Sequence, residues 1–243
     1  MFMSLSHSPL IVRDGLVLCL DAANPRSYPK SGTTWSDLAG ANDGALTNGP
    51  TFDADDKGSI VFDGTDDYCQ INNAHDLINS LDITVCIWIN QHSIHTNTSF
   101  ASQINLFELP AASSIGSYST FYLTLRSGTV TFRYQKQANQ AQVSPSSSQE
   151  INVWRNYIAT SDSTSISLYK DGQSLGSNSS TYSFSSFNGS YNGVRLGETG
   201  YYHNHYDGQI GLFQMYNRAL TASEVLQTIT QQGEIWHLKV API

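Results

Sequence analysis

The feature that most constrains the fold is a strand followed directly by a helix near the end of the chain. Residues 208–216 open with a glycine and are rich in aliphatic and aromatic side chains, which is the composition of a buried strand. Thr221 and Glu224 then have the spacing of a capping box, in which each side chain hydrogen-bonds the other residue's backbone N–H. Apolar residues at helical spacing follow, and we expect Gly233 to end this helix.

This ending resembles the close of laminin-G-like domains in the concanavalin A-like lectin/glucanase superfamily. Both have an Asp-Gly pair, a strand, the run Tyr-Asn-Arg-Ala-Leu and then Thr-x-x-Glu, here between Asp207 and Glu224. The resemblance implies an all-β fold, a two-sheet antiparallel jelly-roll sandwich with one short C-terminal helix. It implies no particular chemistry, because folds of this kind host binders, enzymes and structural modules.

Short strand-like runs separated by turn signals predict the same sandwich. Ser127-Gly128 joins two such runs as a hairpin. The run 81–90 is apolar on both faces, so we expect an inner strand covered by the second sheet on one face and by loops on the other. Residues 22–40 and 143–149 are predicted to be loops. The expected strands are 15–21, 59–62, 67–71, 81–90, 103–109, 121–126, 129–135, 154–161, 165–170, 194–197 and 208–216, with a weak one at 182–184.

Residues 15–71 resemble a narrower group. Leu-Asp-Ala-Ala-Asn-Pro, Gly-Thr-Thr-Trp, Leu-Thr-Asn-Gly-Pro-Thr-Phe and Phe-Asp-Gly-Thr-Asp-Asp-Tyr occur there in this order. This series of motifs is similar to the one that opens laminin-G-like modules in structural proteins of tailed phages. The resemblance therefore implies a virion protein, as a capsid decoration or a tail/fibre-associated module. Its partners would be other virion proteins and like subunits, because symmetric particles favour homo-oligomers.

One domain of residues 14–243 after an N-terminal arm of residues 1–13 is the simplest division of the chain. The 243 residues suffice for one large sandwich, and neither an internal repeat nor a linker interrupts them. The arm is apolar and contains a proline, so it could serve as a short docking segment on a neighbouring subunit.

Charge and sequence signals argue against several classes of partner. Only 13% of residues are charged and the net charge is −8, whereas nucleic acid binding depends on neutralising phosphates. No apolar run approaches the ~20 residues of a membrane span, and we see no secretory signal at the start. We therefore expect no nucleic acid partner, no membrane insertion and a protein folded in the host cytoplasm before it joins a virion. The basic residues look scattered, without a stripe: Arg26, Lys30, Arg126, Arg133 and Arg155.

The three cysteines, Cys19, Cys69 and Cys86, each lie in an apolar run. An odd number without CxxC spacing argues against a disulfide framework or a zinc site. We expect buried free thiols that pack as small hydrophobes.

Two loops carry candidate sites. The first is a cluster of aspartates that could bind Ca²⁺, which prefers carboxylate and carbonyl oxygens; its candidate ligands are Asp63, Asp66, Asp67 and Asp207, with Asp21 as a further possibility. The alternative is that these aspartates form turns and cap backbone N–H groups.

The second candidate site is an aromatic loop that could stack on sugar rings, because such side chains combine an apolar face with a polar tip. Its residues are Tyr201, Tyr202, His203, His205 and Tyr206. The alternatives are a subunit contact, a self-packed loop or, through His203 and His205, a metal site.

Catalysis is not expected. The glutamates at 108, 150, 198, 224 and 234 lack the Glu-x-Asp-x-x-Glu spacing of glycoside hydrolases in this superfamily, and no nucleophile-elbow, phosphate-loop or HExxH motif occurs. The predicted function is a non-enzymatic virion structural protein that also contacts host surface polysaccharide. The alternative is a calcium-dependent carbohydrate-binding adhesin or lectin.

Overall fold

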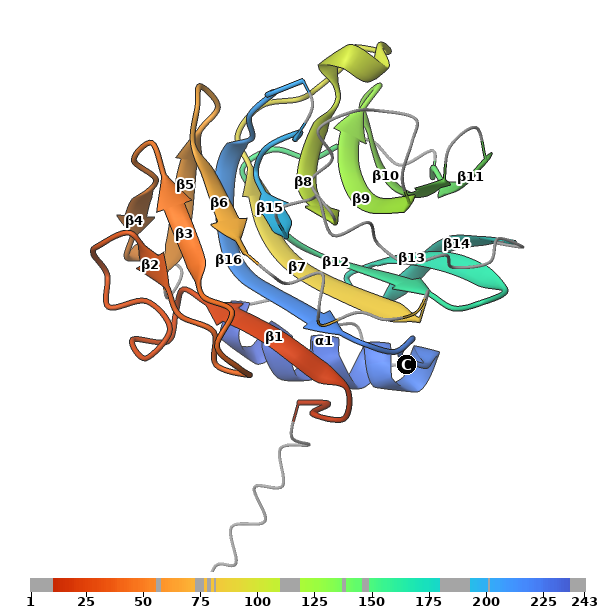
Figure 1. The fold of residues 1–243 in the computed structure, drawn as a ribbon, viewed down its shortest axis with the longest axis horizontal. Helices are drawn as coiled ribbons and strands as arrows, with labels where there is room; N and C mark the ends of the chain where they lie inside the picture. The colour runs from red at the N-terminus through yellow and green to blue at the C-terminus, as the bar shows by residue number, and fades with distance from the viewer. Residues whose placement is uncertain are drawn as a thin grey trace, which may run out of the picture.

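The computed structural model describes residues 11–55, 58–72, 77, 80, 82–109, 119–136, 139–145, 149–179, 193–200 and 202–236. Their strands form two antiparallel sheets, as the sequence predicted, and each sheet has eight strands (Figure 1). Sheet A contains β1 (Leu16–Asp21), β4 (Thr51–Asp53), β5 (Ser59–Asp63), β7 (Ile83–Gln91), β12 (Trp154–Ser161), β13 (Ser165–Lys170), β14 (Gln173–Ser179) and β16 (Asp207–Tyr216). Sheet B contains β2 (Thr34–Trp35), β3 (Gly44–Thr47), β6 (Tyr68–Ile71), β8 (Ile104–Leu109), β9 (Ser119–Arg126), β10 (Thr129–Lys136), β11 (Asn139–Val143) and β15 (Val194–Leu196).

The strand order identifies a jelly roll in which β16 is the central element of sheet A. Sheet A runs β14-β13-β12-β7-β16-β5-β4, and sheet B runs β11-β10-β9-β8-β15-β6-β3-β2. The first strand, β1, pairs with residues 212–216 of β16, while β5 pairs with residues 207–210. The two ends of the domain are thereby joined, which explains why the last strand is the longest and almost wholly buried.

The core lies between the two sheets and follows the alternation of each strand. On β7 the side chains Ile83, Val85, Ile87 and Ile89 face this core. Cys86 and Trp88 point to the other face of sheet A, where the helix α1 (Ala222–Trp236) packs, beside β1 and β16 in Figure 1. The expected inner strand is therefore correct, but the helix covers its second face, where the sequence suggested loops.

The helix begins as its sequence predicts. The backbone N–H of Thr221 donates to Glu224 Oε2 at 2.8 Å, and the N–H of Glu224 donates to Thr221 Oγ1 at 3.3 Å, which completes the capping box. The helix continues through Gly233 to Trp236, so the prediction that Gly233 ends it is wrong. Buried hydrogen bonds of Gln232 to sheet A fix the last turns, and they outweigh the ~1 kcal/mol propensity penalty of one glycine.

Polar strands are where the sequence prediction fails. β2 lies inside the predicted loop 22–40, and both β11 and the end of β14 have the Ser, Asn and Gln composition of a loop. These segments are strands because they pair with β3, β10 and β13 at the sheet edges, where side chains need not be apolar. The expected strand at 182–184 lies outside the described residues.

The cysteines confirm their prediction, since Cys19, Cys69 and Cys86 are all buried free thiols. Burial raises the pKa of the Cys86 thiol to about 12 and that of Cys19 to about 11, which makes both unreactive at neutral pH.

Of the predicted arm, residues 1–10 are not described, whereas Val12 is buried and its carbonyl accepts a hydrogen bond from the Tyr216 hydroxyl at 3.1 Å. No helix in the described part of the chain has the length and apolar character needed to cross a bilayer.

Candidate functional site

The outward face of sheet B, opposite the core, is polar where β9 and β10 pair. On β10, the core residues Val130, Phe132 and Tyr134 alternate with Thr129, Thr131 and Arg133. On β9, the core residues Phe121, Leu123 and Leu125 alternate with Tyr122, Thr124 and Arg126. Because successive side chains of a strand point to opposite faces, all of the polar partners project outward.

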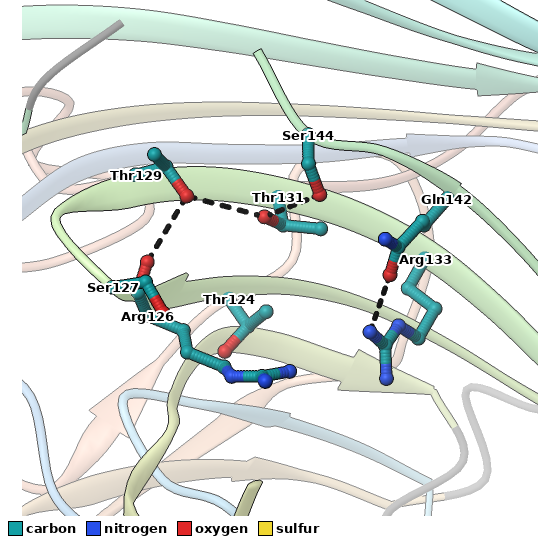
Figure 2. Close-up of a pocket in the computed structure, with 8 residues that line it drawn as sticks. All are labelled: Thr124, Arg126, Ser127, Thr129, Thr131, Arg133, Gln142 and Ser144. Carbon is teal, nitrogen blue, oxygen red and sulfur yellow. Dashed lines mark hydrogen bonds between the residues drawn. The ribbon is translucent and has the colours of Figure 1, made fainter. Parts of the chain in front are cut away.

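All of these outward side chains except Tyr122 line a pocket of about 210 Å³ (Figure 2). Its walls carry five hydroxyl groups, one carboxamide and two guanidinium groups, from Thr124, Ser127, Thr129, Thr131, Ser144, Gln142, Arg126 and Arg133. The volume is below the ~300–1,000 Å³ of pockets for drug-sized ligands, so it suits a group the size of one sugar ring.

Hydrogen bonds fix the polar groups of this pocket. The Arg133 guanidinium donates to the Tyr122 hydroxyl at 3.1 Å and to the side chain of Gln142. Thr131 Oγ1 and Ser144 Oγ are 3.0 Å apart, and Thr129 Oγ1 donates to the carbonyl of Arg126 at 3.0 Å. A ligand would therefore meet donors and acceptors that are already oriented, which lowers the entropy lost on binding.

Burial and neighbouring charge shift the titration of two groups here. Burial raises the pKa of the Tyr122 hydroxyl, so it remains a protonated donor at neutral pH. Burial first, and the positive charge of Arg133 second, lower the pKa of the Arg126 guanidinium. Arg126 remains a cation at neutral pH, because a guanidinium is among the most basic groups in proteins.

Two buried glutamates, which the sequence reasoning did not single out, lie on β8 and directly after β15, its neighbour in sheet B. Glu108 Oε2 accepts hydrogen bonds from Asn105 Nδ2 at 2.8 Å and from the backbone N–H of Gly200 at 2.9 Å. Glu198 forms an ion pair with Arg195 at 2.6 Å and contacts His203 Nδ1 at 2.5 Å. Both carboxylates are thus held by neighbouring donors and position the loop between β15 and β16.

That loop contains the predicted aromatic site, and it borders the same end of sheet B as Arg126. Thr199 Oγ1 and Asn204 Nδ2 donate to the carbonyl of Gln103 at 2.9 and 3.0 Å, just before β8 begins. Ile104, the first residue of β8, pairs with Leu125 beside the pocket. The loop is therefore one strand away from the pocket.

The members of the predicted aromatic site do not share one surface. His203 is exposed, with its side chain 65% accessible, and Tyr202 and His205 are half-buried. Tyr206 is fully buried and packs against Phe62 in the core, so the expectation that its ring meets a sugar is wrong. The residue follows strand periodicity into the sandwich, which a reading of the loop as one aromatic cluster could not detect. Tyr201 lies outside the described residues.

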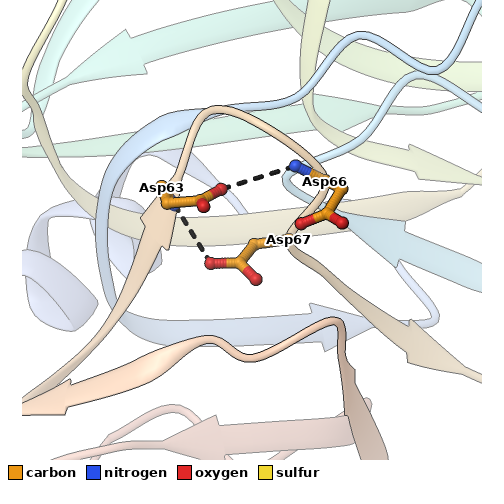
Figure 3. A group of neighbouring side chains, drawn as sticks. All are labelled: Asp63, Asp66 and Asp67. Atoms are coloured by element: carbon orange, nitrogen blue, oxygen red, sulfur yellow. Dashed lines mark hydrogen bonds between the residues drawn. The ribbon is translucent and has the colours of Figure 1, made fainter.

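The predicted aspartate cluster is partly assembled (Figure 3). Carboxylate oxygens of Asp63, Asp66 and Asp67 lie within 4.8 Å of one another. Asp63 Oδ1 accepts from the N–H of Thr65 at 2.8 Å, and Asp67 Oδ2 accepts from the N–H of Asp63 at 3.1 Å. The hydrogen bond from the Thr65 N–H lowers the pKa of Asp63, while burial raises the pKa of Asp67 and outweighs the hydrogen bond that Asp67 accepts. The capping role that the sequence offered as the alternative is therefore present.

The two remaining candidate ligands stand apart from this cluster. Asp207 pairs with Asp63 in the register of β16 and β5, but its carboxylate is 3.5 Å from His92 Nδ1. Asp21 accepts a hydrogen bond from the N–H of Ala23 at 3.0 Å on β1. Among the described residues, the group of three or more potential metal ligands that lie close together is that of the three turn aspartates.

Two facing antiparallel sheets in jelly-roll order, with one helix on an outer face, define the lectin-like class of β-sandwich. The model of one family, the concanavalin A-like lectin/glucanases superfamily, matches residues 63–226, and the chain belongs to that family. No curated protein sequence matches this chain.

Several solved structures share the fold at identities too low to show more than the fold. Domain 4 of AbnA, a GH43 extracellular arabinanase from Geobacillus stearothermophilus in complex with arabinotriose, has a TM-score of 0.68 and 16% identity over 88% of this chain and 98% of that chain. Trypanosoma rangeli sialidase has a TM-score of 0.66 and 16% identity over 91% of this chain and 33% of that chain. The binding domain of botulinum neurotoxin DC in complex with SialylT has a TM-score of 0.66 and 12% identity over 90% of this chain and 52% of that chain.

Proposed function

We propose that this chain is a non-enzymatic glycan-binding module whose binding site is the pocket on the outward face of sheet B. The observation that carries the proposal is a pocket of one-sugar size with preoriented hydroxyl, carboxamide and guanidinium groups on rigid strands. Such groups match the hydroxyls of a sugar, and sites on strands hold their geometry better than sites on loops. Two structures of the same fold were solved in complex with arabinotriose and with SialylT, and the first of these supports a glycan as ligand.

The non-enzymatic part of the proposal is supported by the state of the two buried glutamates. Glycoside hydrolysis needs one carboxyl group as acid and a second as nucleophile or base, both facing the scissile bond. Glu108 is engaged by Asn105 and Gly200, and Glu198 by Arg195 and His203. We therefore expect the module to bind saccharides without cleaving them.

A glycan array with the purified protein tests this proposal. The Gln142→Ala and Ser144→Ala variants remove ligand contacts from the pocket wall, and Tyr202→Ala removes an aromatic ring from the neighbouring loop. We expect specific binding that falls at least tenfold in the two pocket variants, at unchanged melting temperature. Binding that persists in both pocket variants would place the site elsewhere.

We further propose that the module belongs to the virion of a tailed phage, as a capsid decoration or tail/fibre-associated protein that associates with like subunits. The similarity of residues 15–71 to the opening of such proteins supports this role. Val12 packs against Tyr216, so the docking segment would be residues 1–10. Deleting those residues should leave a folded, glycan-binding domain that no longer joins particles, as judged by co-purification. Unchanged incorporation would refute the docking role.

The second candidate function is a calcium-dependent lectin or adhesin, and the aspartate cluster is the observation that favours it. Three carboxylates within 4.8 Å of one another repel, and a Ca²⁺ ion would relieve this repulsion. Running the same array with a chelator distinguishes the candidates, because the pocket alone requires no metal.

A further inference from the structure

We propose that the pocket of Figure 2 binds an acidic sugar, through a carboxylate or sulfate group held between Arg126 and Arg133. This inference rests on the proposed glycan-binding function and names the chemical class of its ligand.

The register of the β9–β10 hairpin places the two arginines at opposite ends of one pocket floor. Thr124 and Thr131 are cross-strand partners and form the middle of the floor. Arg126 follows on one side of this pair and Arg133 on the other, both on the outward face. Figure 2 shows the two guanidinium groups pointing toward one another below Thr131.

The eight residues that line the pocket include two cations and no acidic side chain, in a chain whose net charge is −8. Burial first, and the charge of Arg133 second, lower the pKa of Arg126, so the Arg126 guanidinium lies within the field of Arg133. An anion between them would be attracted by both and would offset their mutual repulsion. The pocket therefore favours an acidic group over a neutral one.

The carboxylate of Glu108, on the neighbouring strand β8, is not among the groups that line this pocket. Glu108 pairs with Tyr122 in the register of β8 and β9, on the side of β9 away from β10. Its Oε2 accepts hydrogen bonds from Asn105 and Gly200, on the side of the loop after β15. In the register of the three strands Tyr122 lies between Glu108 and Arg133, and the Arg133 guanidinium donates to the Tyr122 hydroxyl.

Both guanidinium groups are held in place before a ligand arrives. Arg133 is 4% exposed and is fixed by Tyr122 and Gln142. Arg126 Nε donates to the carbonyl of Thr98 at 2.8 Å. A planar guanidinium matches the oxygen pairs of carboxylates and sulfates, and fixing its orientation reduces the entropy lost on binding. The threonine and serine hydroxyls would meet the neutral hydroxyls of the same ring.

The test is an array of oligosaccharides bearing glucuronate, sialate or sulfate, each printed beside its neutral parent. We expect the acidic member of at least one pair to bind roughly 10–100-fold more tightly, because hydrogen bonds to charged groups are the stronger kind. Raising the salt concentration should weaken that binding. The three acidic arms decide whether a carboxylate or a sulfate is the preferred group.

Arg126→Gln is the principal variant, because Arg126 is the less buried of the two arginines. Arg133→Lys keeps a charge but loses the planar fork. Arg26→Gln, in an exposed loop, removes the same charge elsewhere and serves as the control. We expect Arg126→Gln and Arg133→Lys each to abolish the preference for the acidic member, at a melting temperature like that of the control.

The outcomes separate this inference from the proposed function. Equal binding of neutral and acidic members, lost in Gln142→Ala, would retain the glycan site and overturn its acidic specificity. An acidic preference that survives Arg126→Gln and Arg133→Lys would also overturn it. Absence of binding to any glycan would overturn both.

Discussion

The amide oxygen of Gln232 accepts a hydrogen bond from the indole nitrogen of Trp88 at 2.6 Å, which ties α1 to a central strand of sheet A. The amide nitrogen of Gln232 donates to Gln214 Oε1 on β16 at 2.7 Å. All three side chains are at least 98% buried. One glutamine on the helix therefore hydrogen-bonds polar side chains of two strands, which the helix buries.

Gln232→Ala should lower the free energy of unfolding by about 1–3 kcal/mol, because it leaves the Trp88 N–H and the Gln214 carbonyl buried without this partner. Urea unfolding measures the loss. Thr230→Ala, an exposed position on the same helix, is the control and should change stability by less than about 0.5 kcal/mol. A loss for Gln232→Ala no larger than for the control would show that the bond contributes little.

Acid should destabilise the protein through two paired carboxylates. Hydrogen bonds from Arg218 lower the pKa of Glu224 from 4.5 to about 2, and hydrogen bonds from Arg155 lower the pKa of Glu150 equally. A depressed native pKa stabilises the fold above the unfolded value, near 4.5, and this contribution disappears as the pH falls toward 2.

The Glu150→Gln/Glu224→Gln double variant isolates this effect, since glutamine keeps the shape and the capping geometry. Both pairs are partly exposed, so each should contribute about 0.5–1 kcal/mol. Between pH 6 and pH 2.5, the wild type should lose more stability in urea than the double variant. Parallel losses would exclude these pairs as the source of acid sensitivity.

Gly64 and Gly128 allow backbone strain to be separated from steric contact. Their φ angles are +74° and +73°, but a Cβ on Gly64 would lie 2.8 Å from the Cβ of Asp207, while one on Gly128 would meet no atom within 4 Å. Gly128→Ala should therefore lower the free energy of unfolding by about 1–2 kcal/mol, because alanine is strained in the left-handed conformation. Gly64→Ala should cost a further ~1–3 kcal/mol for the contact. Equal unfolding free energies for the two variants would mean that the turn at Gly64 shifts enough to relieve the contact with Asp207.

Calcium should raise the melting temperature of the wild-type protein if the lectin alternative holds. At 100 times the dissociation constant a bound ion adds ~2.7 kcal/mol, which for a chain of this size corresponds to roughly 5–10 °C. Asp66→Asn removes a carboxylate from the cluster and leaves the Asp63 and Asp67 caps, so it should abolish the rise. Asp55→Asn, on another exposed turn, should retain it. A wild type that calcium does not shift would rule out this site.

The pocket shows what sequence reasoning missed and which signal was available. Arg126 and Arg133 look scattered along the chain. The Ser127-Gly128 turn, however, pairs Arg126 with Thr129 and Tyr122 with Arg133 across a two-residue loop. That register, with the period of two along each strand, places both arginines on one face. Gln142 and Ser144 carried no such signal, because β11 has the composition of a loop.

The sequence by itself determined the elements that depend on neighbouring residues. The capping box of Thr221 and Glu224, the strand β12 and the inner strand β7 follow from local hydrogen bonding and side-chain periodicity. The tertiary structure decided which polar groups meet. It placed Tyr206 in the core, extended the helix past Gly233 and brought Arg126 and Arg133 to one pocket. The physical reason is that burial and strand pairing are set by contacts between distant segments, which residue type and short spacing do not encode.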